Sequence, residues 1–484
     1  MKLLPAFAFV VLAWAAIYLP GLGTPELKGE EARRVLPGRT MMQTGDWIVP
    51  RSAGKVYNRK PPGINWATAA ATKITGRMDE WTVRMPSVLG MLALALFVAT
   101  AMRGFLGKEG ALLAALMTLT NIGFIEKGRL AEIEALYCAT FGIAIVSWLA
   151  LWWREQKLAA WCVSGIVLGL GFLVKGPPHV WFFYAIVIAV LMQEKKTREL
   201  ATWRHALGLL LFFGTFVWWF VLNKGHNPDK DSGAVWMDQI THRLGFSDFD
   251  FVGWLLQIPK GFVNFLPWAL LLPLVFRFPV IGSRFLVAES DDVRKRAILA
   301  GMARGLVIGF LVIAVLPSSR PRFTLPLNTV AALLVAAAVV RLAPLQLRRC
   351  RRWIVGIVVV AAIGMSVYAA LLSRRIVGKE ELRPFAQEIV KHTGSPPRIV
   401  LFRTPERMWP FYLGQGCREI AELAELPDQA RWVMTLAKDR EANLPLLERR
   451  YGKPISETRL KEPVTSDAGG KGWEFVLLEF DGGP

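Results

Sequence analysis

Two neighbouring glutamates, Glu30 and Glu31, are followed closely by Arg33 in a segment that lies between two long apolar runs. A carboxylate can take a proton from a hydroxyl group, and a guanidinium can bind a phosphate through two parallel hydrogen bonds. Further along the chain a third carboxylate, Glu134, follows Arg129. These residue types predict a site in which a carboxylate acts as a base beside a bound anion.

More cations lie in the same segment, at Lys60 and Arg84, and between later apolar runs, at Lys175, Arg320 and Arg322. Arginine can grip phosphate oxygens bidentately and lysine offers a compact charge, and both gain strength where lipid and protein exclude water. Phosphate is therefore the expected anion. For any one of these cations alone, contact with lipid headgroups is an equally good interpretation, because a long side chain near a helix end can reach the aqueous interface.

The composition places these residues in a membrane protein. Of 484 residues, 53% are hydrophobic and 20% are charged, and the mean hydropathy is +0.37. These values exclude an ordinary soluble enzyme, a disordered chain and a small disulfide scaffold. About eleven stretches reach the roughly 20 apolar residues that a membrane-spanning helix needs. They are the N-terminal run to Leu22 and runs centred near residues 95, 118, 144, 167, 186, 214, 270, 308, 332 and 363.

The net charge of +20 would suggest nucleic acid in a soluble protein, but in a polytopic one the basic residues must first be sorted by side. If Lys2 lies inside and the first helix stays as an uncleaved anchor, the short loops near Lys108, Lys157, Lys196 and Arg349 are cytoplasmic. These loops are basic, as short cytoplasmic loops usually are. The candidate site residues then lie on the outer face of the cytoplasmic (inner) membrane, and no nucleic acid partner is expected.

An odd number of spans places residues 374–484 outside as well, where the composition turns polar. Strands are predicted at residues 398–402, 432–436 and 473–480, and helices at residues 380–392 and 441–451. We therefore expect a transmembrane domain over residues 1–373, with a first outer loop at 23–86, and a small extracytoplasmic α/β domain over residues 374–484. The four cysteines have no metal or redox spacing, so no disulfide is predicted.

Several short motifs in a fixed order carry a resemblance. The chain resembles the bacterial protein mannosyltransferase-like family of GT-C-type glycosyltransferases, which includes the lipid A aminoarabinose transferase. The matching segments are residues 29–34, 45–50, 60–63, 84–87, 129–136, 173–177, 266–268 and 318–326. They extend over roughly residues 1–345, and their order is more specific than any one of them.

The resemblance implies a bacterial membrane glycosyltransferase that moves a sugar from a polyprenyl-phosphate carrier to a lipid, glycan or protein acceptor. It implies catalytic roles for Glu30, as general base, and for Glu134 at the second acidic position. The substrate-binding residues that it implies, on the donor phosphate or near it, are Glu31, Arg33, Lys60, Arg84, Arg129, Lys175, Arg320 and Arg322. Such a donor needs no nucleotide-binding loop, and no G-x-x-x-x-G-K-[ST] motif is present.

The sequence departs from the family pattern at several positions. Glu30 and Glu134 stand where the family usually has aspartate, and a shift of about 1 Å in a reacting group can lower a rate on the order of 100-fold. Pro37-Gly38 is expected to kink or break the helix after Glu31. Arg59 replaces an acid of the aminoarabinose enzyme, which argues against a cationic donor sugar, and Phe323 replaces a tyrosine and so lacks a hydroxyl donor.

Two other functions stay open at this stage. A transporter or flippase for polyprenyl-linked or anionic cargo would carry ionisable residues near the bilayer midplane and internal repeats, which the sequence does not clearly show. A non-catalytic lipid-phosphate binder would account for the two aspartate-to-glutamate changes. No cofactor is certain, but a divalent cation shared by Glu30 and Glu134 is an alternative to metal-free displacement.

Overall fold

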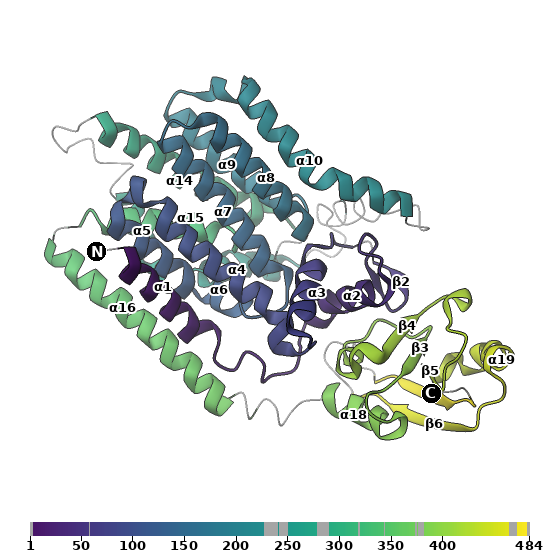
Figure 1. The fold of residues 1–484 in the computed structure, drawn as a ribbon. Coiled ribbons are helices and arrows are strands. Elements are labelled where there is room, and N and C mark those ends of the chain that lie inside the picture. The colour runs from purple at the N-terminus through teal and green to yellow at the C-terminus, as the bar shows by residue number, and fades with distance from the viewer. Residues whose placement is uncertain are drawn as a thin grey trace.

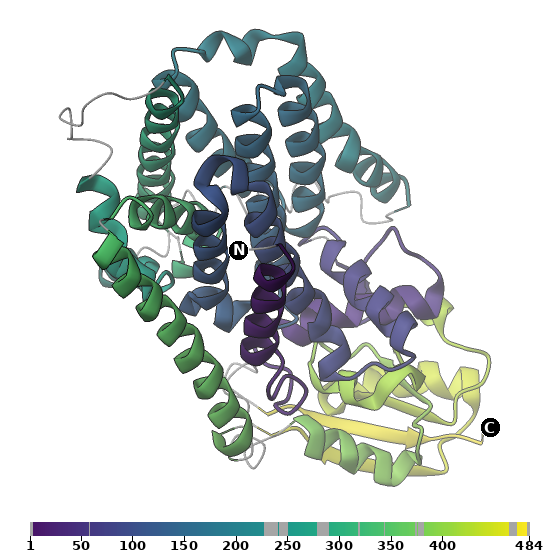
Figure 2. The same cartoon turned by 60° about the vertical axis from the view of Figure 1, so that its left-hand side comes forward.

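The computed structural model describes residues 3–57, 59–226, 241, 250–277, 290–317, 320–342, 344–372, 375, 382–463 and 472–481. A bundle of long helices forms the larger part of the molecule, and a smaller unit with a β-sheet lies at one end of it (Figures 1 and 2). The expected domain boundary at residues 373–374 lies outside the described residues.

Ten helices form the described part of the bundle: α1 (Leu3–Tyr18), α4 (Glu80–Ala101), α5 (Arg103–Thr120), α7 (Ile133–Trp153), α8 (Lys157–Lys175), α9 (Pro178–Gln193), α10 (Trp203–His226), α14 (Ser290–Val315), α15 (Leu327–Val339) and α16 (Pro344–Val367). Shorter helical segments connect or extend them: α6 (Ile122–Lys127), η1 (Thr197–Ala201), α12 (Phe251–Val263), η2 (Trp268–Leu271), α13 (Leu272–Arg277), η3 (Pro321–Thr324) and η4 (Tyr368–Leu372).

Among the described helices, six are long and apolar enough to cross a membrane, and a bent pair of segments makes up to seven. Helices α1, α9 and α15 are apolar but shorter. Helices suit this environment because they satisfy every backbone polar group within the segment. The chain is thus a polytopic α-helical membrane protein, and the number of about eleven spans stays a prediction.

The span predicted near residue 270 is not one continuous helix. Its two halves, α12 and the η2–α13 segment, meet at an angle of 84°. Pro267 stands at the start of η2 and lacks the N–H group that would continue the preceding helix. Asn264, just before the bend, donates a hydrogen bond to the Pro321 carbonyl at 2.8 Å, which ties the bend to η3.

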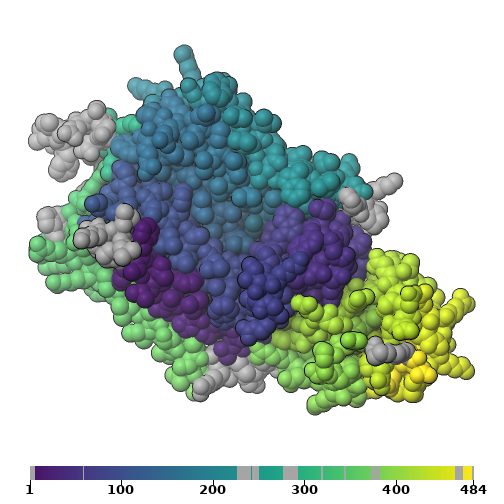
Figure 3. Space-filling view, viewed as in Figure 1, coloured from purple at the N-terminus to yellow at the C-terminus, as the bar shows by residue number. Residues whose placement is uncertain are grey.

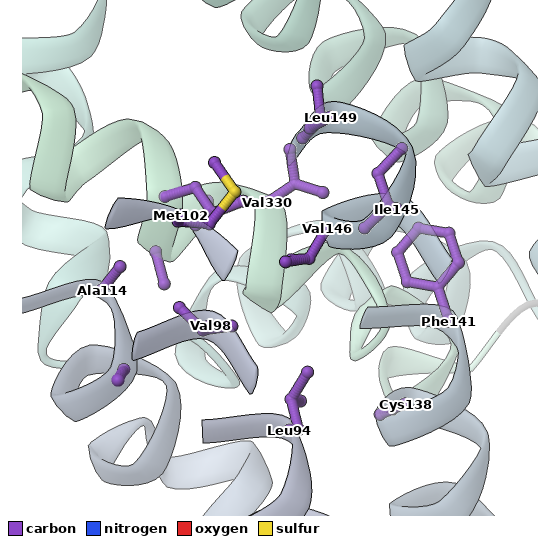
Figure 4. Packing of buried hydrophobic residues seen from close by; sticks show 14 of the residues in the cluster. Leu94, Val98, Met102, Ala114, Cys138, Phe141, Ile145, Val146, Leu149 and Val330 are labelled. Atoms are coloured by element: carbon purple, nitrogen blue, oxygen red, sulfur yellow. The ribbon is translucent and has the colours of Figure 1, made fainter. Parts of the chain in front are cut away.

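Buried apolar side chains join the central helices of the bundle. Figure 4 shows Leu94 and Val98 of α4, Phe141 and Ile145 of α7, and Val330 of α15 gathered in one cluster. In lipid such packing acts through van der Waals contact rather than through exclusion of water. The cluster fixes the positions of α4 and α7, which carry Arg84 and Glu134 near their first residues.

The first outer loop folds into two helices and a hairpin: α2 (Glu31–Thr44), β1 (Arg51–Ser52), β2 (Lys55–Val56) and α3 (Gly63–Thr75). The expected break at Pro37-Gly38 is wrong, because α2 runs through both residues. Gly38 instead permits close packing, since a Cβ there would lie 2.7 Å from the Asn65 carbonyl oxygen. The Asn65 side chain also donates a hydrogen bond to the Arg34 carbonyl, so α3 supports α2 where it carries the candidate site.

The C-terminal unit contains a five-stranded sheet of order β4-β3-β5-β7-β6, in which β3 is parallel to β4 and β5, and β7 is antiparallel to β5 and β6. Its elements are α18 (Leu382–Thr393), β3 (Ile399–Phe402), η5 (Trp409–Gly416), β4 (Cys417–Ile420), η6 (Leu423–Glu425), β5 (Trp432–Leu436), η7 (Ala437–Asp439), α19 (Arg440–Tyr451), β6 (Ser456–Lys461) and β7 (Glu474–Glu479). Strands β4 and β6 were not predicted from the sequence. Both are edge strands with polar, partly exposed residues, so neither forms a continuous apolar run.

This unit packs on the first outer loop (Figure 3). Arg39 of α2 forms an ion pair with Glu419 of β4 at 2.9 Å, and both side chains are almost fully buried. Arg39 also donates to the Pro410 carbonyl at 2.6 Å, and Gln43 donates to the Gln415 carbonyl at 2.6 Å. A buried ion pair therefore fixes α2, the helix that carries part of the candidate site, against the C-terminal unit.

We expect the Arg39→Met substitution to weaken this packing by about 3 kcal/mol, because it leaves the buried Glu419 carboxylate without its cation. Hydrogen exchange would then rise in β4 and in α2. Arg51→Met is the matched control, since Arg51 pairs with the exposed Glu425 at 3.2 Å and such pairs contribute at most about 1 kcal/mol. Equal exchange in the two variants would contradict the prediction.

Candidate active site

Glu30 precedes α2 directly and is held by two arginines of that helix. Arg33 donates to Glu30 Oε1 at 3.1 Å, and Arg34 donates to the other carboxylate oxygen. The Glu30 side chain is 31% exposed, so it can meet a substrate. Arg33 also lies 3.3 Å from Glu406 of the C-terminal unit. Glu30 and Arg33 are therefore close together, as expected. Glu406, more than 370 positions further along the chain, extends this ion pair into a network.

Arg34 was not among the predicted site residues. Its side chain is buried, and it donates hydrogen bonds to Glu30 and to the Tyr57 hydroxyl. Burial raises the pKa of Tyr57, although the nearby Arg34 charge acts in the opposite direction. The sequence signal was available, because Arg34 follows Glu30 by four residues and such pairs share one helix face.

Glu31 and Arg84 form a buried pair that connects α2 with α4. Arg84 donates to both carboxylate oxygens of Glu31, at 2.7 and 2.9 Å. Its remaining N–H groups go to the carbonyls of Leu22, Pro25 and Glu26. An arginine has five N–H groups, so these bonds occupy Arg84 fully. In this structure Glu31 and Arg84 hold the start of α2 against α4, and their expected contact with substrate stays a prediction.

Glu134 meets two of the predicted cations. Lys175 Nζ lies 3.2 Å from Glu134 Oε1, and Arg322 Nε lies 3.6 Å from the same oxygen. The Lys175 ammonium also lies 4.8 Å from the centre of the Tyr137 ring and 5.4 Å from that of Phe323. Helices α7 and α8 and segment η3 thus bring one carboxylate and two cations together in a largely buried place. An aromatic wall of this kind attracts a cation and excludes water.

Lys60 belongs to the turn before α3. The start of α3 packs on the end of α8. Gly63, the first residue of α3, lies so close to Leu173 that a Cβ there would come within 2.7 Å of the Leu173 carbonyl oxygen. The turn therefore lies beside the segment that ends in Lys175. Lys60 itself is half-buried, whereas Arg320 is exposed at the start of η3.

Arg129 occupies a different position, beside α1 and η4. It donates to the carbonyls of Ile17 and Pro20 and lies over the Tyr368 ring. Near it, Lys127 pairs at 3.2 Å with Glu132, a carboxylate that the sequence analysis did not select. Burial raises the pKa of Glu132, and the charge of the neighbouring Glu134 adds to this effect.

The separate ion pairs belong to one electrostatic cluster. Arg34 interacts with Glu134, and Glu132 interacts with both Glu134 and Glu31. The elements that carry these residues meet at the end of the bundle that adjoins the C-terminal unit (Figures 1 and 2). The opposite ends of α7 and α9 carry another network, in which Arg294 pairs with Glu194 at 2.9 Å.

An apolar cavity of about 760 Å³ lies between α12, α13, α14 and α15. Its walls include Phe262, Phe310 and Leu327, and Thr324 of η3 also lines it. Segment η3 therefore carries both a residue of the cavity wall, Thr324, and one of the cations, Arg322. Within the described residues, no three His, Cys, Asp or Glu side chains are grouped so that they could hold a metal ion.

Comparison with known proteins gives consistent results. Residues 59–219 match the family model described as dolichyl-phosphate-mannose-protein mannosyltransferase. The undecaprenyl phosphate-alpha-4-amino-4-deoxy-L-arabinose arabinosyl transferase of Edwardsiella ictaluri is 26% identical over 348 residues, which are 69% of this chain and 59% of that relative. The enzyme of the same name from Serratia proteamaculans is 26% identical over 281 residues, or 56% of this chain and 50% of the relative. The match thus spans only half to three fifths of these relatives' length.

The fold is also similar to that of a solved structure. ArnT from Cupriavidus metallidurans bound to undecaprenyl phosphate aligns with a TM-score of 0.70 and 17% sequence identity, over 99% of both chains. At this identity the likeness establishes a shared fold and leaves the substrates of this chain to be inferred from its own residues.

Proposed function

We propose that this chain, which is similar in sequence to polyprenyl-phosphate-dependent glycosyltransferases and in fold to ArnT, is a GT-C-type glycosyltransferase that transfers a sugar from a polyprenyl-phosphate carrier to a hydroxyl-bearing acceptor. The observation that carries this proposal is the meeting of Glu134, Lys175 and Arg322 beside the apolar cavity. A polyprenyl phosphate requires both features. Its phosphate group requires cations, and its hydrocarbon chain requires an apolar cavity.

The donor phosphate binds at Lys175 and Arg322, and the polyprenyl chain enters the apolar cavity between α12 and α15. Glu134 holds both cations in place until the phosphate arrives. Arg33 and Lys60 complete the donor side of the site. Such fixed cations stabilise the charge that develops on the leaving phosphate, and low water content strengthens their effect.

Glu30 acts as the general base. The acceptor hydroxyl oxygen attacks the anomeric carbon of the sugar while Glu30 takes the hydroxyl proton. The bond between the anomeric carbon and the phosphate oxygen breaks, and its electron pair stays on the polyprenyl phosphate. Arg33 and Arg34 orient the Glu30 carboxylate, and this displacement requires no metal ion.

The charges around Glu30 support a donor sugar without a positive charge. Glu30 and Glu406 offset the charges of Arg33 and Arg34, and Arg59 and Lys60 add two positive charges in the turn before α3. A cationic sugar would meet like charges there, and such contacts act against binding. A neutral hexose therefore fits this site better than the amino sugar named for the relatives. Mass spectrometry of cell-envelope lipids and glycans, with and without the protein, would identify the sugar and its acceptor.

The positive-inside arrangement supports an outer-face site in the bacterial inner membrane, with about eleven spans and the C-terminal α/β unit in the periplasm. Basic residues gather in the loops at the Arg294 end of the bundle, and the candidate site lies at the other end. Cysteine labelling of the exposed Arg418 position in β4, in intact cells with a membrane-impermeant reagent, tests this orientation. Labelling only after the cells are opened would contradict it.

We expect the Lys175→Gln substitution to lower the affinity for undecaprenyl phosphate about 10- to 100-fold, since a hydrogen bond to a charged group contributes about 1.5–3 kcal/mol. Native mass spectrometry or a fluorescence titration of the purified protein measures this affinity. Lys157→Gln is the control, because Lys157 forms an ion pair with Glu199 away from the site. If both variants bind the lipid like the unmodified protein, the donor assignment is wrong.

A further inference from the structure

Glu406 is the point at which the C-terminal unit reaches the candidate site. It lies in the connection from β3 to η5. Its Oε2 atom lies 3.3 Å from Arg33 Nε of α2, and its Oε1 atom accepts a hydrogen bond from the Ser52 hydroxyl of β1 at 3.0 Å. One carboxylate therefore joins the C-terminal unit to both the helix and the hairpin of the first outer loop.

The hairpin holds Glu406 in a defined place, because it packs directly on the backbone of the C-terminal unit. Gly54, at the hairpin turn, has a φ of 75°, and a Cβ there would lie 2.3 Å from the backbone nitrogen of Ala421. Only glycine fits both the conformation and the distance. Ser52 is buried as well. The hydroxyl group that binds Glu406 is thus fixed by close contact between two segments of backbone.

Arg33 lies between two carboxylates that come from different segments. Glu30 Oε1 lies 3.1 Å from Arg33 Nη1, and Glu406 contacts Arg33 Nε. The Arg33 side chain is 37% exposed, and an ion pair with a residue three positions away restricts so long a side chain only weakly. A second carboxylate on another segment removes much of that freedom. Arg34, the other arginine that holds Glu30, is instead fixed by burial and by its hydrogen bond to Tyr57.

The Glu406 pair differs from two other ion pairs at the same interface. The pair of Arg39 with Glu419 is buried and already fixes α2 to the C-terminal unit, and the pair that Arg51 forms on the hairpin is exposed. Of these three pairs, only that of Glu406 includes a residue that also contacts Glu30. Loss of the Glu406 charge is therefore expected to change the position of an arginine in the site, rather than the docking of the unit.

We propose that Glu406 is a positioning residue of the transferase, which acts through Arg33 on the base Glu30. The proposal rests on the proposed function, in which Arg33 orients the Glu30 carboxylate. Glu406 holds the Nε atom of the guanidinium and so keeps its Nη1 atom on Glu30. Catalytic groups must be held to within about 0.5 Å, and contacts from supporting residues supply that precision. The active site is therefore complete only when the C-terminal unit is docked on the first outer loop.

The transfer kinetics of the full-length Glu406→Gln protein test the proposal, with undecaprenyl-phosphate-linked hexoses as donors and a cell-envelope extract as acceptor. Glutamine keeps the size of the side chain but carries no charge, and its single carbonyl oxygen cannot pair with both Arg33 and Ser52. We expect kcat to fall about tenfold, which is less than the roughly 100-fold loss for a 1 Å shift of a reacting group, because Arg33 does not itself react. The KM for the donor should not change, since the donor phosphate is assigned to Lys175 and Arg322.

A double-variant cycle separates this role from a structural one. In an Arg33→Gln background, Glu406→Gln should lower kcat by less than about twofold, because the residue through which it acts is already absent. Glu425→Gln is the matched control, since it removes the exposed carboxylate that pairs with Arg51 on the hairpin. A Glu406→Gln protein as fast as this control would overturn the proposal. So would a loss of the same factor with and without Arg33.

A measurement without turnover keeps this test independent of the proposed function. A water-soluble carbodiimide labels accessible carboxylates, and peptide mass spectrometry gives the labelling rate at Glu30. We expect this rate to be several-fold higher in Glu406→Gln than in Glu425→Gln. Ser52→Ala, which removes the hydrogen bond to Glu406, should give a smaller increase and covers the case in which Glu406→Gln fails to fold. An unchanged rate would overturn the role of Glu406, whereas a raised rate in a protein that transfers no hexose would contradict the proposed function alone.

Discussion

The Glu30→Gln protein is expected to bind donor lipid normally but to transfer sugar about 10²- to 10⁴-fold more slowly. Glutamine has the size of glutamate, and its one carbonyl oxygen can still accept a hydrogen bond from Arg33 or Arg34, but it cannot take the proton of the acceptor hydroxyl. Initial transfer rates at saturating donor, with undecaprenyl phosphate affinity measured in parallel, separate loss of chemistry from loss of binding.

The control for this experiment is Glu425→Gln, which removes another carboxylate from an ion pair with an arginine, here the exposed pair with Arg51. Its transfer rate should remain within about twofold of the unmodified protein, as for most surface changes. A Glu30→Gln protein that transfers as fast as this control would remove Glu30 from the base role. A slow Glu30→Gln protein with normal donor binding would also exclude the non-catalytic lipid binder.

The Glu30→Asp variant separately tests the departure from the family pattern. Arg33 and Arg34 grip the carboxylate at the length of a glutamate side chain. Aspartate would withdraw the carboxylate by about 1 Å, and a displacement of this size can lower a rate on the order of 100-fold. Faster transfer by Glu30→Asp would show that the site has kept the geometry of its aspartate-containing relatives.

The Arg84→Met substitution is expected to destabilise the protein by about 5 kcal/mol, at the upper end of the range for breaking a buried ion pair. It leaves the fully buried Glu31 without a cation and releases three carbonyls of the turn between α1 and α2. The loss should appear as a lower midpoint of unfolding in detergent, together with loss of donor binding, because α2 is no longer tied to α4.

Two further variants make this result specific. The double variant Arg84→Met with Glu31→Leu removes both charges, and we expect it to recover part of the stability, because a buried charge without a partner costs more than an apolar contact. Arg77→Met removes an exposed cation 3.6 Å from Asp79 and should cost less than about 1 kcal/mol. A double variant as unstable as Arg84→Met would show that the released carbonyls, rather than Glu31, account for the loss.

Local patterns made part of the candidate site predictable. Glu30 and Arg33 are three residues apart at the start of one helix, so their ion pair follows from helix geometry alone. Glu134, Lys175 and Arg322 could be assigned to one membrane face by counting spans, although not to one another. The bend at residue 267 was missed because composition over a window records apolarity and not the direction of the chain.

Burial could not be predicted for the charged residues. Glu31 looks like a second acid beside Glu30, but one helix position turns it away from the site and toward Arg84. Arg129 belongs to the same motif as Glu134, yet it packs beside Ile17 and Tyr368, whereas Glu134 pairs with Lys175. Glu406 was unpredictable because its contact with Arg33 joins segments that only the packing of the C-terminal unit brings together.

The sequence alone determined that this chain is a multi-span helical membrane protein with acids and cations between its apolar runs. Both properties are local, since they depend on residue type within about 20 positions. Only the tertiary structure decided which of those charges neutralise one another in the interior and which line a cavity. That division depends on contacts between distant segments, and a buried charge is stable only where such a contact supplies its partner.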